Sequence, residues 1–308
     1  MHKKIKIIIC LLLGFIAIGF LAFILNNFQK PSVRSNKLQV AASFYPLYFF
    51  SQQIGGEKAS VINITPAGAE PHDYEPTAQD IRQIENSKLL ILNGGGLEAW
   101  GENIKQNLNA KNIVIVTVGE GLINRQVLER RENITDPHIW LSPSLVKKIV
   151  DKITQGYIQI DPANKKYYQA NRDTLKTELT KLDNEYRQEL GNCLEKTFIT
   201  SHAAFGYLAS TYGLNQVPIA GLSPDAEPSP QQLAAIVKFA KANNVKYIFF
   251  ESLISPKLSN TIANEVGAKT LVLNPIEGLS NEEVFQGKNY FTEMQNNLAN
   301  IKKALQCK

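Results

Sequence analysis

The chain has 308 residues, of which 44% are hydrophobic and 20% charged, a balance that is typical of globular proteins and excludes a disordered or fibrous chain. Its formal net charge is +5, but residues 1–37 contain six basic side chains and no acidic one, so the rest of the chain carries −1. A body without excess positive charge lacks the footprint of a nucleic-acid-binding protein, and we expect no nucleic-acid partner.

An uncharged run of 19 residues, Ile7–Leu25, lies among those basic residues. It approaches the ~20 residues of a membrane-spanning helix and exceeds the ~7–15 apolar residues of most cleaved signals. Because no small-residue cleavage pattern follows, we expect residues 1–37 to form an export signal that remains as a membrane anchor, followed by a polar spacer. The body would then lie outside the cytoplasm, anchored to the cytoplasmic membrane or cleaved and exported. Lipidation at Cys10 is an alternative that the preceding isoleucines disfavour.

Strand-like and helix-like segments alternate after the spacer. Thr77 and Asp80 form a T-x-x-D capping box, which predicts a helix start in the first half. The strands expected in this half are Leu38–Phe44, Ser60–Thr65, Lys88–Leu92 and Asn112–Val118.

The second half repeats this plan, and Ser-Pro pairs at 229–230 and 255–256 predict two helix starts. Its expected strands are Thr197–Ser201, Asn215–Ile219, Val245–Phe250 and Lys269–Leu273. The pattern predicts an α/β fold of two lobes, each a four-stranded parallel sheet with flanking helices. We expect the lobes to comprise residues 38–160 and 192–308.

Residues 161–191 begin with Asp-Pro, end at a glycine and place apolar side chains at steps of three and four. This pattern predicts one amphipathic helix of about 29 residues, roughly 43 Å long, that joins the lobes as a rigid strut and restricts hinge closure. The alternative is a long helix that lies on one lobe only.

Three of the four histidines, His72, His138 and His202, fall at the carboxyl ends of predicted strands, where open α/β sheets bind ligands. Each alone would more often be a structural histidine. Together they predict a transition-metal site, with Zn²⁺ as the first candidate.

Tetrahedral zinc needs a fourth donor. Glu277, in a loop beyond its strand, is favoured over Glu251, which we expect to accept a hydrogen bond from a ligand histidine or the backbone. Asp73 can play the same outer role beside His72, whereas Glu70 is interpreted as a solvated loop charge.

The exported body contains two cysteines, Cys193 and Cys307. Outside the cytoplasm such a pair can form a disulfide, which we favour over two free thiols.

Four segments, taken in order, resemble the solute-binding proteins of zinc and manganese ABC transporters, in the cluster with a rigid linking helix. They are PHDYEPT with NGGGLEAW, DPHIWLSP, TSHAAFGYLASTYGL, and FFES with NPIEGL. The resemblance covers the chain from Leu38 to Cys307. It implies a monomeric, non-enzymatic receptor that captures Zn²⁺ outside the cell and delivers it to an ABC transporter permease.

The resemblance also implies the metal ligands. The first three segments would each supply one, His72, His138 and His202, and a histidine at the third position marks the zinc type. Many members have a ligand aspartate where this chain has Asn274, so the fourth ligand carried over is Glu277, as in members with N-P-[LI]-E-G-L. The alternatives are a manganese receptor of the same family, a zinc hydrolase with Glu277 or Glu251 as base, and a structural or adhesive surface protein active in cell adhesion.

Overall fold

The computed structural model describes residues 37–108, 112–129 and 132–308. The expected anchor, Ile7–Leu25, and the alternative lipidation site, Cys10, lie outside these residues. In the part of the chain that is described, no helix has both the length and the apolar character required to cross a membrane.

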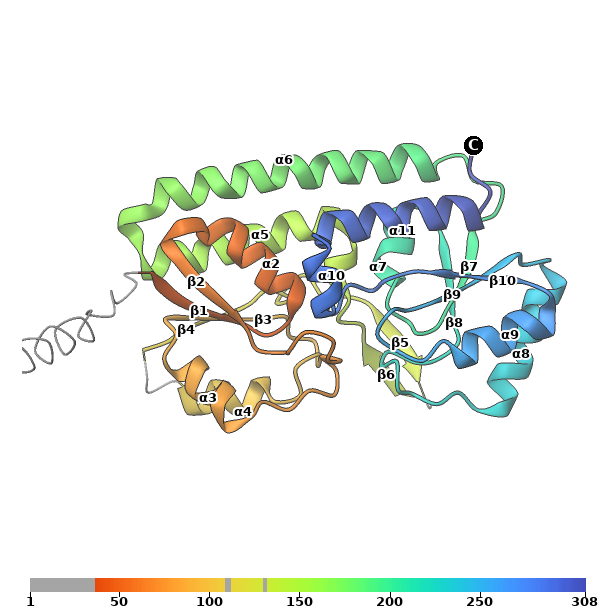
Figure 1. Cartoon of the computed structure of the whole chain (residues 1–308), viewed down its shortest axis with the longest axis horizontal. Coiled ribbons are helices and arrows are strands. Elements are labelled where there is room, and N and C mark those ends of the chain that lie inside the picture. The colour runs from red at the N-terminus through yellow and green to blue at the C-terminus, as the bar shows by residue number, and fades with distance from the viewer. Residues whose placement is uncertain (1–36, 109–111, 130–131) are drawn as a thin grey trace, which may run out of the picture. The chain divides into compact units, whose positions relative to one another are not determined.

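Each half contains one four-stranded parallel sheet, as predicted, and the two sheets have the same topology (Figure 1). The first sheet has the order β2-β1-β3-β4 and the second β10-β9-β7-β8, so that in each the earliest strand lies between the second and the third. The strands are β1 (Leu38–Ala42), β2 (Ala59–Asn63), β3 (Leu89–Leu92), β4 (Val114–Thr117), β7 (Thr197–Thr200), β8 (Asn215–Pro218), β9 (Tyr247–Phe250) and β10 (Lys269–Val272).

Helices cover both faces of the first sheet, because alternate residues of its buried strands point to opposite sides. Val40 and Ile91 pack with α2 (Tyr45–Gly55) and α5 (Pro143–Ile160). Ala41 and Leu90 face the other way, toward α3 (Ala78–Glu85) and α4 (Gly101–Leu108). Short 3₁₀ turns precede β2 and α5, at Gly56–Lys58 and Ile139–Leu141.

The second sheet is covered in the same way. Ile199 and Ile248 pack with α8 (Pro230–Ala242) and α9 (Lys257–Val266). Phe198 and Phe249 lie in the large core on the opposite face. The remaining helices of this half are α7 (Gly206–Thr211), α10 (Asn281–Phe285) and α11 (Tyr290–Ala304).

The predicted capping residues begin two of these helices. Thr77 and Asp80 form the capping box of α3, and Ser229 caps α8 with Pro230 in its first turn. The second Ser-Pro pair is displaced, because Pro256 occupies the cap position of α9 and the helix begins one residue later.

The long segment between the sheets forms a 3₁₀ turn, Pro162–Asn164, followed by the 26-residue helix α6, Lys165–Leu190. Asn171 donates to the Ile54 carbonyl at the end of α2 (2.9 Å), and the Tyr186 hydroxyl donates to the Met294 carbonyl in α11 (2.6 Å). The helix thus packs on helices of both halves, as Figure 1 shows. The alternative that it lies on one half only is wrong.

An antiparallel hairpin of β5 (Gln126–Glu129) and β6 (Glu132–Thr135) leads from the first sheet toward His138, and the sequence analysis did not predict it.

Cys193 and Cys307 form a disulfide, which ties the segment after α6 to the C-terminal tail. The alternative of two free thiols is therefore wrong.

Candidate metal centre

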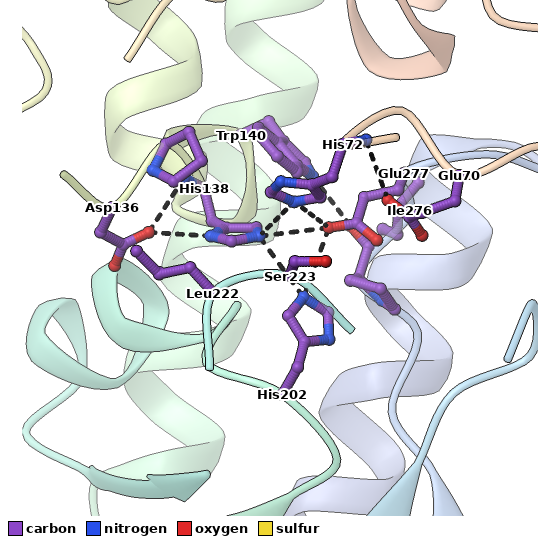
Figure 2. Close-up of polar contacts among 12 residues, drawn as sticks. Glu70, His72, Asp136, His138, Trp140, His202, Leu222, Ser223, Ile276 and Glu277 are labelled. Atoms are coloured by element: carbon purple, nitrogen blue, oxygen red, sulfur yellow. Dashed lines mark hydrogen bonds and ion pairs between the residues drawn. The ribbon is translucent and has the colours of Figure 1, made fainter. Parts of the chain in front are cut away.

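Four loops at the carboxyl ends of the two sheets bring His72, His138, His202 and Glu277 together. His72 lies between β2 and α3, and His138 follows the hairpin and precedes the turn Ile139–Leu141. In the second half, His202 comes two residues after β7, and Glu277 lies in the loop after β10. Figure 2 shows the three imidazoles and the carboxylate directed toward one another.

The distances between the four side chains are short and similar. The Oε1 atom of Glu277 lies 3.5 Å from Nε2 of His72, 3.2 Å from that of His138 and 3.4 Å from that of His202. The Nε2 atom of His138 is 3.2 Å from that of His72 and 3.4 Å from that of His202. All four candidate ligand atoms lie within 4.8 Å of one another.

These separations fit a tetrahedral ion. Zinc with ligand distances of about 2.0–2.1 Å has ligand atoms roughly 3.3–3.4 Å apart along each edge of its tetrahedron. Five of the six edges in this cluster measure between 3.2 and 3.5 Å. Three imidazole nitrogens and one carboxylate oxygen are also donors that suit zinc. The sixth edge, between the His72 and His202 nitrogens, lies within 4.8 Å, so the arrangement can hold a Zn²⁺ ion once these two imidazoles move closer together.

The cluster is almost entirely buried, and His72 is its most accessible member. The side chain of His72 is 10% exposed, whereas those of His138, His202 and Glu277 are 0–1% exposed. Charged groups are buried at this depth only when they are paired or bind metal.

His138 is oriented by Asp136, which the sequence analysis did not single out. Oδ1 of Asp136 accepts hydrogen bonds from the backbone N–H of His138 (3.0 Å) and from its ring Nδ1 (2.9 Å), and Arg125 Nε donates to Oδ2 (3.2 Å). Because Nδ1 is engaged, Nε2 faces the cluster as a donor for metal. In the sequence, the position of Asp136 two residues before His138 could have indicated this role.

His202 is oriented in a similar way by Glu251, at the end of β9. The Glu251 carboxylate lies 2.5 Å from Nδ1 of His202 and also accepts from the Ser201 hydroxyl. Glu251 is buried, so this carboxylate is the local counter-charge for a cationic or metal-bound imidazole.

Asp73 and Glu70 lie close to His72 in the sequence and differ in their surroundings. Asp73 is exposed, and partial desolvation together with a hydrogen bond to Asp225 raises its pKa above the ordinary value. Glu70 is partly buried and accepts from the His72 backbone N–H (3.2 Å). Burial and the nearby Glu277 charge raise the pKa of Glu70 to about 9, so its interpretation as a solvated loop charge is wrong.

The loop that carries Glu277 is held in a strained conformation. Ile276, fully buried, has φ +58, a left-handed value that is rare for a β-branched residue. The Asn274 side chain stabilises this turn, because its oxygen accepts from the Ile276 N–H (2.8 Å) while its amide donates to Glu293 (3.0 Å). Asn274 therefore supports the turn that presents Glu277.

Trp140 connects the loops that carry His138 and Glu277. Its ring lies 5.1 Å from the His138 ring, and its indole N–H donates to the Pro275 carbonyl (2.7 Å). The Tyr290 hydroxyl in turn donates to the Trp140 carbonyl (2.7 Å). Two ligand-bearing loops from different halves are thus fixed to each other by hydrogen bonds between buried groups.

Electrostatic interactions within the cluster separate the pKa values of its members. Burial lowers the pKa of His72. Burial acts in the same direction on His138 and His202, but hydrogen bonds to Asp136 and Glu277 raise the pKa of His138, and the charges of Glu251 and Glu277 raise that of His202 well above its ordinary value. Burial opposes ionisation of Glu277, yet the neighbouring imidazoles hold its pKa well below the usual range. The ionised Glu277 carboxylate therefore lies among three imidazoles, and a divalent cation bound between them would interact favourably with all four side chains.

Comparisons with known proteins point to the same chemistry. A family model described as zinc-uptake complex component A, periplasmic, matches residues 40–304. The high-affinity zinc uptake system protein ZnuA of Bacillus subtilis (strain 168) is 42% identical to this chain over 293 residues, which is 91% of this chain and 92% of that protein. The zinc-binding lipoprotein AdcA of Streptococcus pneumoniae (strain ATCC BAA-255 / R6) is 36% identical over 96% of this chain, which spans 60% of AdcA.

A solved structure shows that the likeness extends to three dimensions. The crystal structure of the Zn(II)-bound ZnuA-like domain of Streptococcus pneumoniae AdcA matches with a TM-score of 0.77 at 38% identity, covering 87% of this chain and 99% of that chain. Sequence, fold and the four-residue cluster agree, and the chain belongs to the family described as zinc-uptake complex component A, periplasmic.

Proposed function

We propose that this protein is the receptor that captures Zn²⁺ outside the cytoplasm and delivers it to the permease of an ABC uptake system. The observation that carries the proposal is the convergence of three Nε2 atoms and the Glu277 carboxylate at the separations of a tetrahedral zinc site. The relatives named for zinc uptake and zinc binding support the choice of cargo.

We infer a preference for zinc over manganese from the ligand set. Three neutral imidazoles and one carboxylate leave a net charge of +1 on the bound ion, which is tolerable in a buried site. Manganese is better suited to carboxylate, carbonyl and water ligands, whereas this cluster consists of three imidazoles and one carboxylate.

Calorimetric titration of the metal-free protein with Zn²⁺ and with Mn²⁺ tests the proposal. We expect one zinc ion per chain, bound more tightly than manganese. Tighter binding of manganese would show that the cargo is wrong, and absence of zinc binding would remove the receptor function altogether.

We propose that the protein acts as a transport receptor and not as a zinc hydrolase. Hydrolysis requires an open position for water on the metal, but the Glu277 oxygen lies within reach of all three imidazole nitrogens and closes the fourth position. A zinc-dependent hydrolytic activity that survives Glu277→Gln would contradict this proposal. If the protein were a structural or adhesive surface protein, the buried cluster would be dispensable. Replacing any one ligand histidine by alanine would then leave growth under zinc limitation unchanged, whereas the receptor function predicts impaired growth.

The division of labour within the chain is also part of the proposal. Residues 38–160 and 192–308 would act as two lobes that enclose the ion, with residues 161–191 as the linking helix. Because α6 packs on helices of both halves, release would proceed by a small tilt or a loop rearrangement and not by wide hinge opening. We further propose a monomer, attached to the membrane through residues 1–37.

A further inference from the structure

The hairpin β5–β6 and the loop before it connect the first half of the molecule to the second beside the zinc site. The backbone N–H groups of Asn124 and Arg125 both donate to the hydroxyl of Tyr207 in α7, at 2.9 and 3.0 Å. The Arg125 guanidinium lies against Gly206, where a Cβ atom would approach its Nε to 2.5 Å. The entry to the hairpin is therefore fixed next to the His202 loop.

The far end of β5 makes a second connection. The Glu129 carboxylate accepts a hydrogen bond from the backbone N–H of Leu222, in the loop that follows β8. Gly221 lies directly against the same carboxylate, and a Cβ atom at that position would overlap it. The contact is thus built from both sides, by an anionic acceptor and by a residue without a side chain.

The loop that Glu129 holds is part of the wall of the metal site. The Gly221 carbonyl accepts from the N–H of Ala203, the residue after the ligand His202 (2.8 Å). Leu222 is 5% exposed and belongs, with Ser223, to the residues around the imidazoles in Figure 2. A zinc ion that leaves the cluster on this side must displace this loop.

We propose that Glu129 is a positioning residue that holds the loop Gly221–Ser223 against the zinc site and thereby controls how fast zinc is exchanged. The inference rests on the proposed function as a zinc receptor. Glu129 does not touch the metal and acts through the loop. A hydrogen bond to a charged acceptor stabilises the closed loop more than a neutral one does, so its loss should increase the rate of zinc release.

The test is the rate of zinc release, measured by mixing zinc-loaded protein with an excess of a chromogenic chelator in a stopped-flow instrument. We expect Glu129→Ala to release zinc roughly tenfold faster than the wild type, since one charge-assisted hydrogen bond is lost. Glu129→Gln keeps an acceptor oxygen and the shape of the side chain but loses the charge, so its release rate should fall between those of the wild type and Glu129→Ala. Glu132→Ala is the matched control, because Glu132 pairs with Glu129 in the hairpin and is exposed.

Gly221→Ala tests the contact from the opposite side. Alone it should accelerate zinc release, because its methyl group displaces the Glu129 carboxylate; combined with Glu129→Ala it should add nothing, because the space is then free. The absorption spectrum of the Co²⁺-loaded variants should match that of the wild type, because the four ligands are untouched.

The outcomes separate the inference from the proposed function. If the wild type binds zinc but Glu129→Ala and Glu132→Ala release it at the same rate, or if the two substitutions at the contact act additively, the role of Glu129 is wrong and the receptor function stands. If the wild type does not bind zinc, the proposed function itself fails.

Discussion

In the first half of the molecule, the carboxylate that orients His138 belongs to Asp136, two residues earlier in the same loop. In the second half, the carboxylate that orients His202 belongs to Glu251, 49 positions away and directly after β9. The two sheets have the same strand order, so the difference does not come from topology. The first half fixes its imidazole through local chain geometry, and the second half through packing of β9 beside β7. The support of His202 therefore depends more strongly on the tertiary structure.

Glu277 extends this contrast. Its loop is held by Asn274, which is bonded in turn to Glu293 and Asn297 of α11. The carboxylate ligand and the His202 partner thus both depend on contacts between distant segments. We therefore expect substitutions of a metal ligand to reduce zinc affinity most, and substitutions of residues that only position a ligand to reduce it less.

The largest effect is expected for Glu277→Gln. This change removes the negative charge that the three imidazoles share, and loss of a direct ligand should weaken zinc binding by more than the ~10–100-fold typical of an outer partner. Competition with a chromogenic chelator measures the affinity. Glu265→Gln, at an exposed position of α9, is the control; equal affinity in the two variants would exclude Glu277 as a ligand.

Asp136→Asn and Glu251→Gln should have intermediate effects, and comparing them tests the difference between the halves directly. Each should lower zinc affinity by about 10–100-fold, because each removes the charge that orients a ligand imidazole. We expect the larger loss for Glu251→Gln, since Arg125 already offsets part of the Asp136 charge. A larger loss for Asp136→Asn in the same titration would reverse the comparison.

Trp140→Phe should have a smaller effect on affinity and a measurable one on stability. It removes the hydrogen bond to the Pro275 carbonyl, which leaves a buried acceptor unpaired and should reduce the free energy of unfolding by about 1–3 kcal/mol. Urea denaturation measures the change. Trp100→Phe is the control, because Trp100 packs on the other face of the first sheet and should not affect zinc affinity. An equal loss of affinity in both variants would argue against a connection of the two ligand loops through Trp140.

The smallest effect on zinc binding is expected when Cys193 and Cys307 are both replaced by serine. The disulfide closes a segment with a sequence separation of 114 residues, so its removal should lower the free energy of unfolding by about 2–5 kcal/mol. Zinc affinity should not change, because the bridge joins the segment after α6 to the C-terminal tail and does not involve the ligand loops. Thermal unfolding and zinc titration of the same sample check both statements, and a fall in affinity would show that the second half transmits strain to the site.

The sequence predicted the two parallel sheets and the gathering of the three histidines with Glu277, because strand periodicity and position at strand ends are local properties. It did not predict the hairpin β5–β6, since four-residue strands with alternating polar side chains give a weak signal. The outer role of Asp73 beside His72 stays a prediction. Side-chain direction in a loop depends on which distant segment packs against it, and no local pattern encodes that.

Asp136 shows the opposite situation. Its position two residues before His138 was visible in the sequence, but an Asp-Pro pair has an equally ordinary meaning as a turn. Only the contact with Nδ1 in the structure distinguishes the two meanings. The role of Glu70 was misjudged for a similar reason, because burial of a loop charge depends on the other half of the molecule.

The strained turn at Ile276 has a consequence for anyone who engineers this scaffold. A buried isoleucine at φ +58 stores on the order of 1–3 kcal/mol, and glycine would relieve it. Ile276→Gly would also remove a fully buried side chain from the core, which costs about 2–5 kcal/mol, and it would free the backbone that aims the Glu277 carboxylate. The isoleucine thus stabilises the core and fixes the Glu277 loop at the same time, so a more stable scaffold should take its gains from other parts of the chain.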